Sequence, residues 1–126
     1  MALLNVHSGP TILGGTSESD VLGLGADFVV GLVCPDEWTP APVSVMVSVQ
    51  GDNYLDLFDG KGSEFTFNVT PGIAMPVDPN LLLMAAFIRL RSGTRDNPVP
   101  QEATRRFYIV GTTKLAAVSQ LPTEGQ

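Results

Sequence analysis

Short runs of hydrophobic residues, most of them alternating with polar ones, recur along the chain. Alternation with a period of two is typical of a strand with one buried face, whereas a helix repeats every three to four residues. The clearest run is residues 43–50, in which valines at the odd positions form the expected buried row. The strands predicted in this way are Thr11–Leu13, Glu18–Leu24, Phe28–Cys34, Val43–Gln50, Tyr54–Phe58, Glu64–Val69, Ile73–Val77, Phe87–Arg91 and Arg105–Val110.

Turn-forming residues separate these runs. Asp59-Gly60 and Lys61-Gly62 predict a tight hairpin, because glycine readily adopts positive φ. Asp78 followed by Pro79 predicts a single helical turn, with the aspartate as its cap. Many short strands at regular spacing predict an all-β fold, a β-sandwich or jelly roll with about eight antiparallel strands. We expect an extended N-terminal arm over residues 1–8, the sandwich over 9–111 and a C-terminal tail over 112–126.

The size and composition of the chain suit one domain with a hydrophobic core. It has 126 residues, of which 44% are hydrophobic, and no apolar run is long enough to span a bilayer. The first residues lack the basic region and sustained apolar stretch of a secretory signal, so none is predicted. The single cysteine, Cys34, excludes an internal disulfide and fits folding in a reducing cytosol.

Charge is distributed unevenly along the chain. The net charge is −6, but residues 1–78 carry −9 and residues 79–126 carry +3. The acidic total argues against non-specific binding of nucleic acid. The asymmetry fits a subunit whose basic edge meets an acidic neighbour, such as another copy of itself. Solvated charges distributed over different strands without a function would fit equally well.

Five of the seven basic residues lie in residues 87–110, FIRLRSGTRDNPVPQEATRRFYIV. Arginine can hold a carboxylate through two parallel hydrogen bonds, and arginines on alternating strand positions would lie on a flat sheet surface. The low lysine content also favours assembly with other proteins. We predict that carboxylates of a partner protein bind Arg89, Arg91, Arg95, Arg105 and Arg106.

The chain offers few residues for catalysis or metal binding. Its one histidine, His7, lies in the predicted arm, and Cys34 has no base near it in the sequence that would lower its pKa. The acidic run from Asp52 to Glu64 lacks the alternating oxygen ligands of an EF-hand before Gly60, and a solvated hairpin explains it better than a calcium site between loops. We therefore expect no catalytic residue, no metal and no cofactor.

Trp38 is the only tryptophan and lies among prolines in PDEWTPAPV. We interpret it as a structural anchor that closes one end of the sandwich, with its indole N–H bonded to a loop carbonyl. The alternative is a platform for sugar stacking, which a lone aromatic residue serves poorly.

Two stretches resemble a recurrent small protein of tailed-phage structural gene clusters. In residues 29–67, an apolar strand enters a Pro–x–x–Trp–Thr–x–Ala turn, and a further strand leads to an aspartate-rich hairpin. In residues 87–110, a strand ends in Arg91-Ser92-Gly93-Thr94, a loop contains Pro98-Val99-Pro100-Gln101, and a last strand opens on arginine. The likeness covers roughly residues 16–111, with Pro100 departing from the looser residue expected there. It brings no catalytic residues.

The resemblance implies a non-enzymatic virion structural protein, with a capsid cement or decoration protein as the leading hypothesis. Such a protein would bridge neighbouring capsomers on the capsid exterior and stabilise the mature head after assembly in the host cytoplasm. The expected partners are the major capsid protein and further copies of the chain in a dimer or trimer, without nucleic acid or membrane. The alternatives are a head–tail connector or neck subunit, a tail or baseplate subunit, and a carbohydrate-binding module on the virion.

Overall fold

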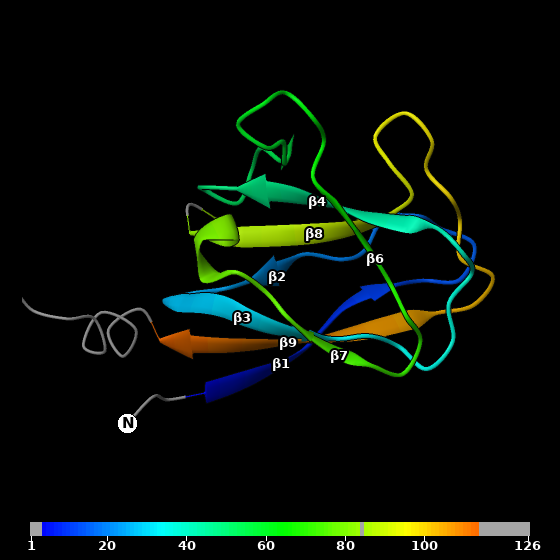
Figure 1. The fold of residues 1–126 in the computed structure, drawn as a ribbon, viewed down its shortest axis with the longest axis horizontal. Helices are drawn as coiled ribbons and strands as arrows, with labels where there is room; N and C mark the ends of the chain where they lie inside the picture. Colours follow the sequence, from blue (N-terminus) through cyan, green and yellow to red (C-terminus); the bar gives the residue numbers. More distant parts are fainter. Residues whose placement is uncertain (1–3, 84, 114–126) are drawn as a thin grey trace, which may run out of the picture.

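The computed structural model describes residues 4–83 and 85–113, which form two antiparallel sheets and one short 3-10 helix (Figure 1). The first sheet has the strand order β1-β9-β3-β7. The second sheet has the order β2-β8-β4-β5, and β6 also pairs with β4. The elements are β1 (Leu4–Ile12), β2 (Leu22–Gly23), β3 (Asp27–Val33), β4 (Pro42–Ser48), β5 (Leu55–Asp56), β6 (Thr66–Asn68), β7 (Ala74–Pro76), η1 (Pro79–Leu82), β8 (Phe87–Ser92) and β9 (Arg105–Thr113). The predicted all-β fold is confirmed.

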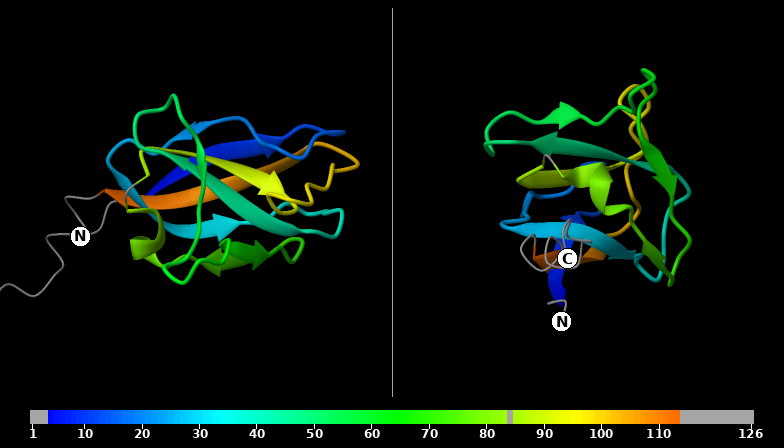
Figure 2. Two further views of the ribbon diagram at one scale, coloured as in Figure 1. Left: turned by 90° about the horizontal axis from the view of Figure 1, so that it is seen from above. Right: turned by 60° about the vertical axis from the view of Figure 1, so that its left-hand side comes forward.

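The two sheets lie one above the other, and the segment from β5 to β7 crosses between them (Figure 2). Alternate side chains of the long strands point inward, as strand geometry requires, and form the core. These core side chains are Val29, Leu32, Val43, Val45, Val47, Ile88, Leu90, Phe107 and Ile109. The predicted valine row of residues 43–47 is therefore buried, whereas Val49 lies beyond the end of β4 and is exposed.

Residues 4–8 belong to β1, although the sequence predicts an arm there. Leu4 pairs with Thr112 and Val6 pairs with Val110 on β9, so the arm prediction is wrong for residues 4–8. The side chains of residues 4–6 are exposed on both sides of the strand, which removes the burial pattern that reveals a strand in the sequence. Residues 1–3 lie outside the described part of the chain. In the predicted tail, residues 112 and 113 belong to β9, and residues 114–126 lie outside the described part.

The predicted strand Glu18–Leu24 is reduced to the two residues of β2 and two isolated bridges. Ser19 explains the interruption. Its buried hydroxyl oxygen accepts the Leu90 backbone N–H at 2.9 Å and donates to the Asp20 carbonyl at 2.7 Å. The Ser19 side chain thus accepts a backbone N–H that in a regular sheet would donate to a carbonyl of the neighbouring strand. The helical turn is confirmed as η1, with the Asp78 carboxylate accepting the Asn80 N–H at its start.

Three of the sequence motifs meet at one end of the two sheets, around the buried side chain of Gln101. Its Nε2 donates to the Thr39 carbonyl at 3.0 Å and to the Ser92 hydroxyl at 2.7 Å. Its Oε1 accepts the Thr39 N–H at 2.9 Å and the Arg105 Nε–H at 3.1 Å. Both donors and both acceptor positions of the amide are therefore used. This Gln101 junction links the β3–β4 connection, the end of β8 and the start of β9.

Trp38 stands beside this junction. Its indole N–H donates to the Ala41 carbonyl at 3.0 Å, which is the kind of loop acceptor predicted from the sequence. The indole ring meets the edge of Phe107 at a centroid distance of 5.5 Å, so it extends the core toward the β3–β4 connection.

Gly93 follows β8 and explains the glycine of the Arg-Ser-Gly-Thr motif. Its φ is +93°, and a Cβ atom at this position would lie 2.7 Å from the Val99 backbone nitrogen. Its carbonyl accepts the Ser44 hydroxyl and its N–H donates to the Pro42 carbonyl. Only a residue without a side chain permits this close approach of the 97–99 backbone to residue 93, which is hydrogen-bonded to the start of β4.

Replacing the Gln101 amide tests the junction. We expect Gln101→Met to lower the free energy of unfolding by about 2–4 kcal/mol, because it keeps the side-chain volume but leaves buried groups of Thr39 and Arg105 without a partner. Gln50→Met, at an exposed position, is the control and should change it by less than about 0.5 kcal/mol. Urea unfolding followed by Trp38 fluorescence measures both. Equal effects of the two substitutions would contradict the role of the junction.

Candidate functional site

The five arginines singled out in the sequence lie in different parts of the structure. Arg89 and Arg91 are on β8 in the second sheet, whereas Arg105 and Arg106 are on β9 in the first sheet. Arg95 lies in the loop after β8. The prediction that they form one flat surface is therefore wrong. Its physical reason is that β8 and β9 are separated by a loop that passes from one sheet to the other rather than by a hairpin.

Arg91 is the most enclosed charge on the outer side of the second sheet, with 8% of its side chain exposed. Its Nη2 lies 2.7 Å from Asp56 Oδ1 and 2.8 Å from Glu64 Oε2. Its Nε donates to the Ser44 hydroxyl at 3.0 Å. A buried guanidinium is stable only with counter-charges and filled hydrogen bonds, so this contact holds the 57–65 hairpin against the sheet.

Arg95 completes the same network from its exposed loop. Its backbone N–H donates to the Glu64 carboxylate at 3.0 and 3.2 Å, and its Nε lies 3.5 Å from Asp56 Oδ2. The side chain itself is 61% exposed, so the guanidinium stays accessible to a partner.

The predicted hairpin is confirmed, and Asp59 caps its turn. Of the two glycines expected at positive φ, Gly62 has a φ of +90°, whereas Gly60 does not have positive φ.

The Asp59 Oδ1 accepts the N–H groups of Ser63 at 3.0 Å and Lys61 at 2.7 Å. These backbone hydrogen bonds, that of Ser63 first, hold the pKa of the Asp59 carboxyl below its usual range. Asp59 of this run therefore serves the turn of the hairpin, and Asp56 pairs with Arg91 beside it.

Arg105 and Arg89 also have acceptors within the domain. Arg105 is buried, donates to Gln101 and places Nη1 3.7 Å from Glu37 Oε2. Arg89 Nε donates to the Ser19 carbonyl at 3.0 Å, and its Nη2 lies 3.4 Å from Glu18 Oε1. Arg105 is therefore part of the Gln101 junction, and Arg89 fastens the 18–19 segment to β8.

Arg106 is exposed and lines a depression of mixed charge together with Arg89, Glu18 and Asp20. Because acids and bases alternate around it, this depression has no single sign of charge that would attract an ionic ligand.

The uneven charge of the chain is explained within the domain. Each arginine–carboxylate ion pair found among the described residues joins an arginine from residues 79–126 to an acid from residues 1–78. The arginines of residues 79–126 thus neutralise part of the acidic charge of residues 1–78 through contacts between distant segments. Among the five arginines, Arg95 and Arg106 keep exposed side chains for contacts with other molecules.

The outward side of the first sheet is apolar along the N-terminal part of β1 and the adjacent part of β9. Strand register and alternating burial place one set of side chains from β1, β3 and β9 on this side. We call the uncharged members of this set the outer face; they are Leu4, Val6, Phe28, Val33, Tyr108 and Val110. Arg106 lies on the same side of β9, two residues before Tyr108, at the margin of this face. Leu4 is 64% exposed and Val6 is 69% exposed. The outer face ends at β1, the last strand of its sheet in the described part of the chain.

A polar cluster on the inward side of β1 was not predicted. Asp27, which is buried, has Oδ2 2.8 Å from His7 Nε2, and its Oδ1 accepts the Asn5 amide at 3.1 Å. Gly111 makes the room, because a Cβ atom there would lie 3.0 Å from Asp27 Cβ. The cluster fastens β1 to β3 across β9. The sequence feature that could have indicated this cluster is the two-residue spacing of Asn5 and His7, because residues two apart in a strand lie on the same side of it.

Cys34 is a buried thiol at the end of β3. Burial raises its pKa, and a backbone hydrogen bond from Thr70 opposes that shift in part. Within residues 4–83 and 85–113, no group of three histidine, cysteine or acidic side chains could hold a metal ion. The same residues contain no helix with the length and hydrophobicity needed to cross a bilayer.

Comparisons with protein-family models, curated proteins and solved structures found no match to this chain.

The Arg91 network provides a test of the structural role of the arginines. We expect Arg91→Met to lower the free energy of unfolding by about 3–5 kcal/mol, since Asp56 and Glu64 would keep their charges without the guanidinium between them. Arg95→Met removes an exposed arginine from the same network and should cost about 1 kcal/mol or less. Chemical denaturation at neutral pH compares the two. A loss for Arg91→Met no larger than that for Arg95→Met would contradict this role.

Proposed function

We propose that this chain is a non-enzymatic structural protein of a phage virion, of the capsid cement or decoration type. It binds the capsid exterior, bridges neighbouring capsomers and stabilises the mature head. The observation that carries the proposal is the outer face, an uncharged apolar sheet surface ending at an edge strand. Large exposed apolar surfaces of this kind mark sites of protein association.

We also propose that the strand order is that of a jelly roll, a fold found in viral capsid proteins. β5 and β6 pair with successive parts of β4 in the same direction and count as one strand interrupted by the 57–65 hairpin. The first strand then pairs with the last, the second with the last but one, and so on inward, from β1 with β9 to β4 with β5 and β6. An antiparallel ribbon wrapped into two sheets produces this nesting.

The occupant of the outer face is a second copy of this chain. The chain carries a net charge of −6, so two copies repel each other through most of their charged surface. A two-fold interface must be complementary to itself, and the uncharged side chains of the outer face, with Arg106 only at its margin, meet that condition. Tyr108, at the centre of β9, is a residue type enriched in such interfaces. Pairing through this face leaves Arg95, in the loop after β8, available for carboxylates of the major capsid protein.

Bridging explains how such a protein would stabilise a head. A protein that binds across the seam between capsomers in the mature geometry, and not in the immature one, shifts the equilibrium toward the mature shell by mass action. A dimer holds two capsid-binding sites at a fixed separation, which raises the effective concentration of the second site.

Self-association through the outer face is tested by Val6→Lys. We expect the wild-type chain to form a dimer and Val6→Lys to weaken it at least about tenfold, because the substitution puts like charges on two apolar surfaces that face each other. Val49→Lys is the matched control, since Val49 is 68% exposed but follows β4 in the second sheet. Sedimentation velocity over a range of concentrations measures both. A wild-type monomer at all concentrations, or equal effects of the two lysines, would contradict the proposed interface.

Capsid binding is tested by mixing the purified chain with expanded and unexpanded capsids of the phage that encodes it. We expect stoichiometric binding to expanded capsids and little binding to unexpanded ones. Equal binding to both forms, or to neither, would remove the cement hypothesis. Imaging of intact particles distinguishes the alternatives, because a cement protein is spread over the head whereas a neck or connector subunit forms one ring.

A further inference from the structure

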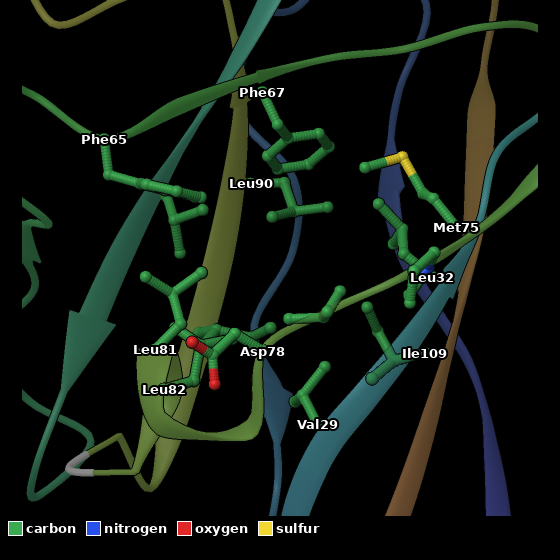
Figure 3. Close-up of a pocket in the computed structure, with 14 residues that line it drawn as sticks. Val29, Leu32, Phe65, Phe67, Met75, Asp78, Leu81, Leu82, Leu90 and Ile109 are labelled. Carbon is green, nitrogen blue, oxygen red and sulfur yellow. The ribbon is translucent and has the colours of Figure 1, made fainter.

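A pocket of about 310 Å³ opens between the two sheets beside β7 and η1 (Figure 3). Both sheets contribute to its walls, with Val29 and Ile109 from the first and Leu90 from the second. Phe65 and Phe67 cover it from the segment that crosses between the sheets. The pocket is therefore enclosed mainly by aliphatic and aromatic side chains.

The pocket is too large to be an ordinary packing defect. Protein interiors contain few voids larger than a water molecule, and an apolar cavity of about 150 Å³ already accommodates benzene. The volume found here lies at the lower end of the range for small-molecule sites, roughly 300–1,000 Å³. Phe65, Phe67 and Met75, which line the pocket, are only partly buried against the core.

One charged group lies at the pocket, the carboxylate of Asp78 at the start of η1. Its Oδ1 accepts the Asn80 N–H at 3.0 Å, which holds the side chain in place. Figure 3 shows the carboxylate next to Leu81 and Leu82, and Asp78 is exposed, so its carboxylate lies at the mouth of the pocket. No basic residue lines the pocket, so Asp78 favours a hydrogen-bond donor or a cation and disfavours an anion.

We propose that this pocket binds a small amphiphile with a single aliphatic or aromatic body and a neutral or positively charged polar end. The body fills the space between the sheets, and the polar end donates a hydrogen bond to Asp78. This binding site is independent of the outer face, which lies on the opposite side of the first sheet. Ligand binding in the pocket is therefore additional to the proposed role as a virion protein, and the two proposals are tested by separate experiments.

Three probes that share an octyl chain test the proposal: octylamine, 1-octanol and octanoate. Each is titrated into the full chain by isothermal titration calorimetry. We expect octylamine and 1-octanol to bind, and octanoate to bind at least tenfold more weakly than octylamine. Failure of both octylamine and 1-octanol to bind would overturn the proposal, as would octanoate binding as tightly as octylamine.

Two variants locate the site. Val77→Trp places a large side chain at the pocket and should weaken octanol binding more than tenfold, whereas Val21→Trp, at an exposed position away from it, should leave binding unchanged. Asp78→Asn keeps an oxygen to accept the Asn80 N–H but removes the charge, so the preference for octylamine over octanoate should fall about tenfold. If Val77→Trp does not fold, Met75→Phe serves the same purpose. Binding that is insensitive to both the filling and the Asp78 substitutions would overturn the assignment.

Discussion

The buried amide of Gln101 is the contact on which the arrangement of the two sheets depends. It binds the backbone of Thr39 in the β3–β4 connection, the Ser92 hydroxyl at the end of β8 and the Arg105 guanidinium at the start of β9. Because these segments come from both sheets, the junction fixes the sheets relative to each other at one end. The apolar pocket opens toward the end that carries η1, where no comparable polar junction joins the sheets within the described residues.

The polar side chains that look most like binding residues in the sequence are used largely to hold the fold. Arg91 and Arg105 are buried among acids and amides of the same domain, and Trp38 gives its indole N–H to a loop carbonyl. A buried arginine already surrounded by its counter-charges has little left to offer a partner. The surfaces that remain are apolar: the outer face of the first sheet and the pocket between the sheets. Association through such surfaces draws on the hydrophobic effect more than on charge.

Much of the fold can be predicted from the sequence because it depends on local alternation. Residues 43–47 and 87–91 show their strands directly, and Asp78 with Pro79 marks η1. The placement of the arginines cannot be predicted in this way, since Arg91 meets acids 35 and 27 residues away, and that depends on which strand joins which sheet. The end of β1 overlaps the predicted strand Thr11–Leu13, but its first residues, 4–8, are missed for a related reason. Their pairing with β9 joins opposite ends of the domain, and the exposed side chains of residues 4–6 leave no burial pattern. The pocket has no sequence signal, because the residues around it are ordinary core residue types.

Hydrogen–deuterium exchange on the wild-type chain, at dilute and at high protein concentration, tests the central claim that polar contacts hold the fold and apolar surfaces carry association. We expect the amides of Thr39 and Gln101 to exchange only on global unfolding at both concentrations. We also expect amides of β1 to exchange rapidly in the dilute chain and to become protected as it associates. Fast exchange at the junction, or protection on association confined to the loops around Arg95 and leaving β1 unchanged, would contradict this claim.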